Sequence, residues 1–66
     1  MRVLVNGSEQ EIEPNSTVAA LLARHQLQPN HAAVEINLDL VLRRDYASTV
    51  LREGDRVEIV TLVGGG

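Results

Sequence analysis

The chain has 66 residues and a formal net charge of −3, so it forms one small domain with a small core. It contains no cysteine, which excludes disulfides, a thiol nucleophile and a thiolate metal site. One tyrosine is its only aromatic residue, no basic stripe is present and no apolar run could span a bilayer, so we expect a cytoplasmic protein that binds neither nucleic acid nor membrane.

The first predicted element is a β-hairpin. Residues 1–5 are mostly aliphatic and read as one strand, and residues 9–13 read as its polar return. Asn6 and Gly7 lie between them, and both tolerate the positive φ angles that a type I′ turn requires. Pro14 cannot donate a hydrogen bond to a strand partner and ends the hairpin. Because three glutamates share one face of the second strand, we expect that strand at a solvent-facing edge.

A helix is predicted over residues 18–25, with Ser16 or Thr17 as its cap. Its apolar side chains recur at the spacing of one helical face, which should pack against a sheet. These side chains are Val18, Leu21 and Leu22.

Three further strands are predicted, over residues 32–37, 40–42 and 56–62. Residues 43–48 are polar, and we interpret them, with Tyr46, as a solvated connecting turn of some helical character. The order of hairpin, helix and further strands predicts an α+β protein.

The element order is that of the β-grasp or ubiquitin-like fold, in which one main helix packs across a mixed sheet of four or five strands. In that fold the last strand is central and lies beside the first. A different small α+β arrangement is the alternative. We expect residues 1–66 to form a single domain, with residues 63–66 as a flexible glycine tail.

The tail Val63-Gly64-Gly65-Gly66 directly follows the last predicted strand. Because glycine has no Cβ, Gly64 and Gly65 can thread a narrow channel of a partner and present the Gly66 carboxylate to a reactive group. That carboxylate is ionised at neutral pH and can attack a phosphorus atom, and the acyl-adenylate formed with ATP would then accept a nucleophile. Three terminal glycines can also be a frayed end or a cloning remnant.

ATP itself must be bound by another protein, because the chain has neither a phosphate-binding P-loop motif nor any lysine. We therefore expect no bound cofactor and no metal. His25 and His31 have no cysteine or paired carboxylate nearby to complete a metal site, and solvated or capping roles fit them better.

Strand alternation predicts an exposed surface for partner binding. If Val3, Val5, Val57 and Ile59 face the helix, the aliphatic side chains that alternate with them face outward. These are Leu4, Val60 and Leu62, with Val63 at the start of the tail. They can form an interaction patch. Scattered surface aliphatics are also ordinary in proteins, and that interpretation stays open.

Nearly the whole chain resembles the ThiS family of bacterial sulfur carrier proteins of thiamine biosynthesis. The resemblance is carried by residues 3–7 (VLVNG), 17–22 (TVAALL), 33–37 (AVEIN), 53–60 (EGDRVEIV) and 63–66 (VGGG). The chain departs from the family pattern at Leu38 and Leu42, where glycine and proline are frequent.

The resemblance implies a carrier and not an enzyme. A ThiF-type adenylyltransferase would use ATP to adenylate the Gly66 carboxylate, a cysteine desulfurase relay would supply sulfur for a thiocarboxylate, and thiazole synthase would take that sulfur. We expect the free chain to be a monomer. The alternatives are a related carrier for molybdopterin, cysteine or tRNA thiolation, and a non-covalent ubiquitin-like interaction domain with an inert tail.

Overall fold

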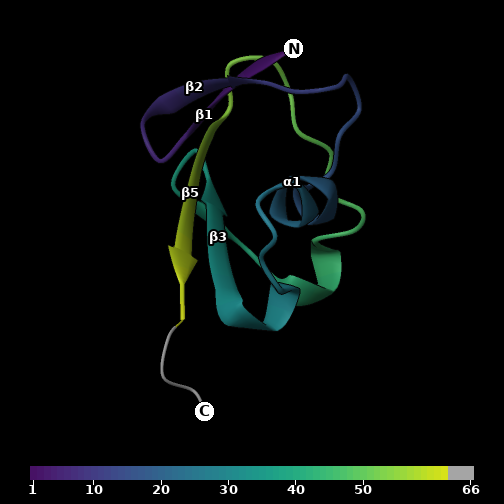
Figure 1. The fold of residues 1–66 in the computed structure, drawn as a ribbon, viewed down its shortest axis with the longest axis vertical. Helices are drawn as coiled ribbons and strands as arrows, with labels where there is room; N and C mark the ends of the chain where they lie inside the picture. Colours follow the sequence, from purple (N-terminus) through teal and green to yellow (C-terminus); the bar gives the residue numbers. More distant parts are fainter. Residues whose placement is uncertain (63–66) are drawn as a thin grey trace.

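The computed structural model describes residues 1–62, which form one five-stranded sheet and one α-helix (Figure 1). The elements in chain order are β1 (Arg2–Val5), β2 (Ser8–Glu11), α1 (Val18–Arg24), the 3-10 turn η1 (Pro29–His31), β3 (Ala32–Ile36), β4 (Asp39–Val41), the 3-10 turn η2 (Arg43–Asp45) and β5 (Arg56–Thr61). The strand order across the sheet is β2-β1-β5-β3-β4.

The last strand, β5, is central, as the sequence predicts. It runs parallel to β1, where Leu4 is opposite Arg56. It runs antiparallel to β3 over five residue pairs, which end with Ala32 opposite Thr61. The end of β5 is therefore paired with β3, and β5 as a whole lies between β1 and β3.

The N-terminal hairpin closes through the predicted type I′ turn. Val5 pairs with Ser8, so the loop has two residues, and these are Asn6 with φ 50° and Gly7 with φ 85°. The polar strand β2 is an edge strand, which confirms that prediction.

Charged groups along this edge are paired with one another. The Met1 amine lies 2.6 Å from a carboxylate oxygen of Glu11. Arg2 lies 3.5 Å from Glu9 and 3.8 Å from Glu11. The positive charges of the Met1 amine and Arg2 therefore offset the repulsion between Glu9 and Glu11.

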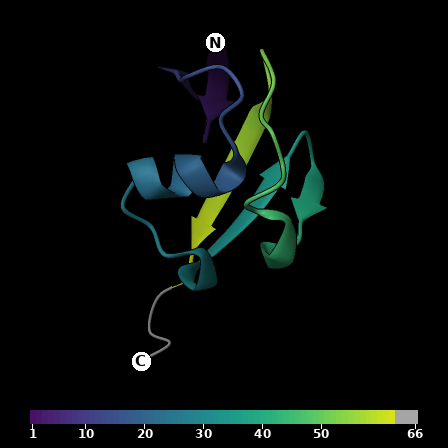
Figure 2. The ribbon, with the colours of Figure 1, turned by 90° about the vertical axis from the view of Figure 1, so that its right-hand side faces the viewer.

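Helix α1 covers one face of the sheet, and Figure 2 shows it crossing in front of β5. Thr17 caps the helix, since its hydroxyl accepts a hydrogen bond from the Ala20 N–H at 3.1 Å. The helix ends at Arg24, one residue before the predicted end, and His25 is its C-cap. The buried core lies between helix and sheet and consists of Val3, Val5, Ile12, Val18, Leu21, Leu22, Ala32, Val34, Tyr46, Leu51 and Val57.

The prediction that Tyr46 lies in a solvated turn is wrong. Its side chain is only 4% exposed, and its hydroxyl donates a hydrogen bond to the Ala32 carbonyl at 3.0 Å. The segment after η2 folds back along α1, where the Ala19 N–H donates to the Tyr46 carbonyl and Thr17 bridges to Val50. This polar-looking segment therefore completes the core.

Several strand boundaries also differ from the prediction by one or two residues, and β2, for example, spans Ser8–Glu11 in place of residues 9–13. Asn37 and Leu38 both have positive φ angles, 52° and 74°, and form the turn between β3 and β4. Asp39 therefore already belongs to β4, which ends at Val41. Strand β5 ends at Thr61, one residue earlier than expected.

The buried hydroxyl of Tyr46 provides a test of the core. We expect Tyr46→Phe to lower the free energy of unfolding by about 1–2 kcal/mol, because the Ala32 carbonyl then stays buried without a donor. Urea unfolding of the two proteins measures the difference. Equal stability would show that this hydrogen bond does not matter to the fold.

The ion pair at the N-terminus provides a pH test. The pKa of Glu11 lies below the usual value of 4.5, mainly because the Met1 amine donates a hydrogen bond to its carboxylate. The positive charge of the Met1 amine and, less strongly, that of Arg2 lower this pKa further. A carboxyl with a lowered pKa stabilises the fold above its unfolded-state pKa, and this contribution disappears as the pH falls through the folded-state pKa. We expect Glu11→Gln to be less stable than the unchanged chain at pH 7, with the difference shrinking as the pH falls below 4.5. A difference that does not vary with pH in urea unfolding would contradict this.

Candidate functional site

The candidate site is the end of β5, where the glycine tail begins. The predicted tail residues Val63, Gly64, Gly65 and Gly66 lie outside the described residues, so their roles stay predictions. The structure shows the base from which they continue. Strand β5 runs toward the end of the molecule that is opposite Met1 (Figure 1).

Backbone hydrogen bonds hold the end of β5 against β3. Thr61 is opposite Ala32, the first residue of β3. One residue further, the Leu62 N–H donates to the His31 carbonyl at 2.7 Å. The last described residue is therefore anchored to the turn η1, and its position relative to the sheet is defined.

Asn6 holds the other side of β5 with its side chain. The Ile59 N–H donates to the carboxamide oxygen at 2.7 Å, and the carboxamide nitrogen donates to the Ile59 carbonyl at 3.1 Å. The Asn6 backbone N–H also donates to the Val57 carbonyl at 2.8 Å. Because the chain turns away after Val5, the carboxamide continues the pairing of β1 with β5. The sequence places Asn6 only in a turn, and nothing near it in the chain indicates this second role.

Asn37 has a comparable role at the start of β5. Its carboxamide oxygen accepts a hydrogen bond from the Arg56 N–H at 3.0 Å, and its nitrogen donates to the Asp55 carboxylate at 3.0 Å. The Asn37 N–H in turn donates to the Arg56 carbonyl at 2.8 Å. Two asparagines thus align β5 with its two neighbours, which fixes where the strand ends.

The aliphatic residues predicted for partner binding do not form one patch. Val60 is 60% exposed and Leu62 is 51% exposed, and both lie at the end of β5. Leu4 is partly buried and lies opposite Arg56, four residues before Val60. At about 3.3 Å per residue, Leu4 and Val60 are roughly 13 Å apart along the strand direction. The structure therefore brings Val60 and Leu62 together and separates Leu4, and their role in binding stays a prediction.

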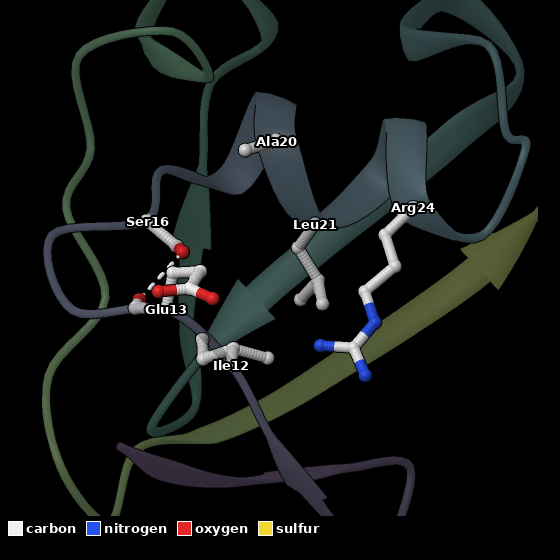
Figure 3. A pocket seen from close by; sticks show the side chains of 6 residues that line it. All are labelled: Ile12, Glu13, Ser16, Ala20, Leu21 and Arg24. Atoms are coloured by element: carbon white, nitrogen blue, oxygen red, sulfur yellow. Dashed lines mark hydrogen bonds between the residues drawn. The ribbon is translucent and has the colours of Figure 1, made fainter.

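A cavity of about 200 Å³ lies under the connection from β2 to α1, far from the end of β5 (Figure 3). It is lined by Ile12, Glu13, Ser16, Ala20, Leu21 and Arg24. The Arg24 guanidinium donates to the Glu11 carbonyl at 2.7 Å, and the Ser16 hydroxyl donates to the Glu13 carbonyl at 2.6 Å. Arg24 therefore links the end of α1 to the end of β2, and Ser16 stabilises the turn within the connection.

Within residues 1–62, no three side chains of the metal-binding types gather into a cluster. Nε2 of His25 lies 3.1 Å from the side-chain oxygen of Gln10, and His31 is exposed on η1. No helix in this part of the chain has the length and apolar character needed to cross a membrane.

The mixed sheet with parallel β1 and β5 at its centre, covered on one face by α1, defines a protein of the β-grasp, ubiquitin-like class. The predicted fold class is confirmed. Within this class the chain belongs to the ThiS family, whose profile matches residues 3–66.

Solved and curated relatives agree with this membership. The crystal structure of the thiamine biosynthesis protein ThiS from Geobacter metallireducens superposes with a TM-score of 0.83 at 29% identity, over 100% of both chains. The sulfur carrier protein ThiS of Escherichia coli is 27% identical over 100% of both sequences.

A second group of relatives is longer. A thiazole synthase of Paramagnetospirillum magneticum is 38% identical to this chain over all 66 residues, which are 20% of that protein. A thiazole synthase of Magnetococcus marinus is 36% identical, again over 20% of its length. The chain thus spans about a fifth of the thiazole synthases that it matches.

The carboxamide of Asn6 can be tested directly. We expect Asn6→Gly to lower the free energy of unfolding by about 1–2 kcal/mol, because glycine accepts the positive φ angle but loses both hydrogen bonds to Ile59. The Ile59 amide should also exchange its hydrogen faster than in the unchanged chain.

Asn15→Gly is the matched control. Asn15 also has a positive φ angle, 66°, and no side-chain hydrogen bond of Asn15 occurs within residues 1–62. This variant should leave the exchange of the Ile59 amide unchanged. Equal exchange in both variants would mean that the Asn6 side chain does not hold β5.

Proposed function

We propose that the chain is a sulfur carrier for thiamine (thiazole) biosynthesis. The observation that supports this most is that the family match continues through the glycine tail to residue 66. The likeness to the Escherichia coli and Geobacter ThiS proteins also extends over their full lengths. In this proposal the chain is a co-substrate of partner enzymes and does not itself catalyse a reaction.

The first step is activation of the tail. The carboxylate of Gly66 attacks the α-phosphorus of ATP in the active site of a ThiF-type adenylyltransferase, forming an acyl-adenylate and releasing pyrophosphate. Activation is needed because the carboxylate oxygen is a poor leaving group, whereas AMP is a good one. Gly64 and Gly65 have no side chains, so the tail fits a narrow channel that leads to the bound ATP.

The second step places sulfur on the tail. A persulfide sulfur, supplied by a cysteine desulfurase relay, attacks the acyl carbon and displaces AMP. A thiol of the relay then reduces the resulting disulfide bond and leaves a thiocarboxylate on Gly66. Since the chain contains no cysteine, all of this sulfur comes from the partners.

The third step is transfer to thiazole synthase. Two relatives in which the matching segment makes up a fifth of a thiazole synthase support this acceptor. A thiocarboxylate held at the end of a docked protein reacts as if it were at high local concentration, and free sulfide is avoided. The anchored end of β5 suits transfer to a partner enzyme. Val60, Leu62 and the predicted contact Val63 can bind the partner's surface beside the channel that takes up the glycine tail.

Intact mass spectrometry tests the proposal. The purified chain is incubated with ATP, a ThiF-type adenylyltransferase, a cysteine desulfurase and cysteine. We expect its mass to increase by the difference between one sulfur and one oxygen atom, because the Gly66 carboxylate becomes a thiocarboxylate. Deletion of Gly66 should abolish the increase.

The control is Ala47→Ser, a change at an exposed residue of the connection after η2, which should react fully. An unchanged mass, with an adenylyltransferase that is active on a known carrier, would contradict the proposal. It would favour a non-covalent ubiquitin-like domain.

A further inference from the structure

Leu38 is held in an unfavourable backbone conformation without any benefit to the core. Its φ angle of 74° lies in the left-handed region, which glycine adopts easily and a leucine adopts only at a cost. Its side chain is 87% exposed, so burial within the chain does not offset that cost. Strain of this kind is concentrated at functional positions.

Two more leucines follow at alternate positions, Leu40 in the edge strand β4 and Leu42 directly after its end. Leu40 is 64% exposed and Leu42 is 44% exposed. Leu40 is opposite Glu35 of β3, so it points to the open face of the sheet, away from α1. Edge strands of monomeric proteins often carry charged side chains, and β4 has one, Asp39, directly beside the exposed Leu40.

Two carboxylates lie directly opposite each other beside these leucines. Glu35 of β3 is paired with Glu58 of β5, and both are exposed. Like charges in such a cross-strand pair destabilise a sheet. Within residues 1–62, no cationic group lies within 4.0 Å of either carboxylate, in contrast to Glu9 and Glu11 on the same face.

A small cavity lies between Leu38 and Glu58. It has a volume of about 80 Å³ and is lined by Asn37, Leu38, Arg56 and Glu58. Arg56 is therefore close to Glu58 but makes no ion pair with it. We call Glu35, Leu38, Leu40, Leu42 and Glu58 the β3–β4 surface.

We propose that the β3–β4 surface is the docking site for the acceptor enzyme, thiazole synthase. A basic side chain of that enzyme binds between Glu35 and Glu58, and aliphatic side chains around it cover the three leucines. This inference rests on the proposed carrier function. It adds the surface and the partner chemistry that select the acceptor.

The choice of occupant follows from charge and position. A basic group removes the repulsion between the two carboxylates, whereas a second copy stacked face to face would place carboxylates against carboxylates. The surface is next to the end of β5, because Ala33 and Val60 form the pair two residues from Glu35 and Glu58 on the same face. The match of this chain to segments of thiazole synthases indicates that such a unit and that enzyme function together.

The test measures binding of the unmodified full chain to purified thiazole synthase by calorimetry. We expect the double variant Glu35→Gln, Glu58→Gln to bind at least about tenfold more weakly and with a smaller salt dependence, since a charge pair is lost at the interface. The matched control is Glu9→Gln with Glu11→Gln. It removes the same charge from the same sheet face, and its affinity should stay within about threefold.

The variant Leu38→Gly distinguishes an effect on binding to thiazole synthase from an effect on the stability of the fold. This variant should have a higher urea midpoint than the unchanged chain, because the strain at position 38 is relieved, yet it should bind thiazole synthase more weakly. Weaker binding by a more stable protein cannot result from unfolding. All variants should still acquire the thiocarboxylate, because activation does not use this surface.

Four results would overturn the proposal. The first two concern affinity for thiazole synthase: it is equal in all variants, or both double variants lose it equally. The third is that the variants lose activation by the adenylyltransferase and keep binding to the synthase. The fourth is that the free chain forms a dimer, which the changes at Glu35 and Glu58 disrupt. A failure of the carrier function itself would be recognised separately, since the unchanged chain would then gain no sulfur by mass.

Discussion

The pairing of β5 with strands on both sides is the interaction on which the rest of this small protein depends. Its backbone groups are satisfied on one side by β1 and on the other by β3, segments distant from it in the chain. Because buried backbone groups must be hydrogen-bonded, the sheet is complete only when the last strand has inserted. The same pairing fixes the position of the end of β5, where the Leu62 N–H still donates to the His31 carbonyl.

Two asparagines make this pairing accurate. Asn6 and Asn37 both occupy turns with positive φ angles, which asparagine tolerates better than most residues. Both then use their carboxamides as substitutes for a peptide group beside β5. Asparagine therefore meets two needs at once: it tolerates the positive φ angle of the turn, and its side chain hydrogen-bonds to the backbone of β5. The turn of the hairpin is thereby linked to the position of β5.

The open face of the sheet has two electrostatically different halves. Near β2, the acidic side chains are balanced by Arg2 and the Met1 amine. Near β3, Glu35 and Glu58 oppose each other next to exposed leucines, and no cationic group of residues 1–62 lies within 4.0 Å of them. The buried core lies on the helix side of the sheet, so groups on the open face contribute little to it.

The sequence by itself determined those features that depend on neighbouring residues. Alternation of apolar side chains, the Asn6-Gly7 turn and a cap at Ser16 or Thr17 predict the hairpin, the helix and the strands. The order of these elements, through its likeness to the β-grasp fold, predicts the central last strand, and the glycine tail predicts the chemistry of the chain end. Only the tertiary structure decided the burial of Tyr46, the bonds from Asn6 to Ile59 and the opposition of Glu35 and Glu58. Each of these depends on the register between segments far apart in the chain, and such register leaves no local signal in the sequence.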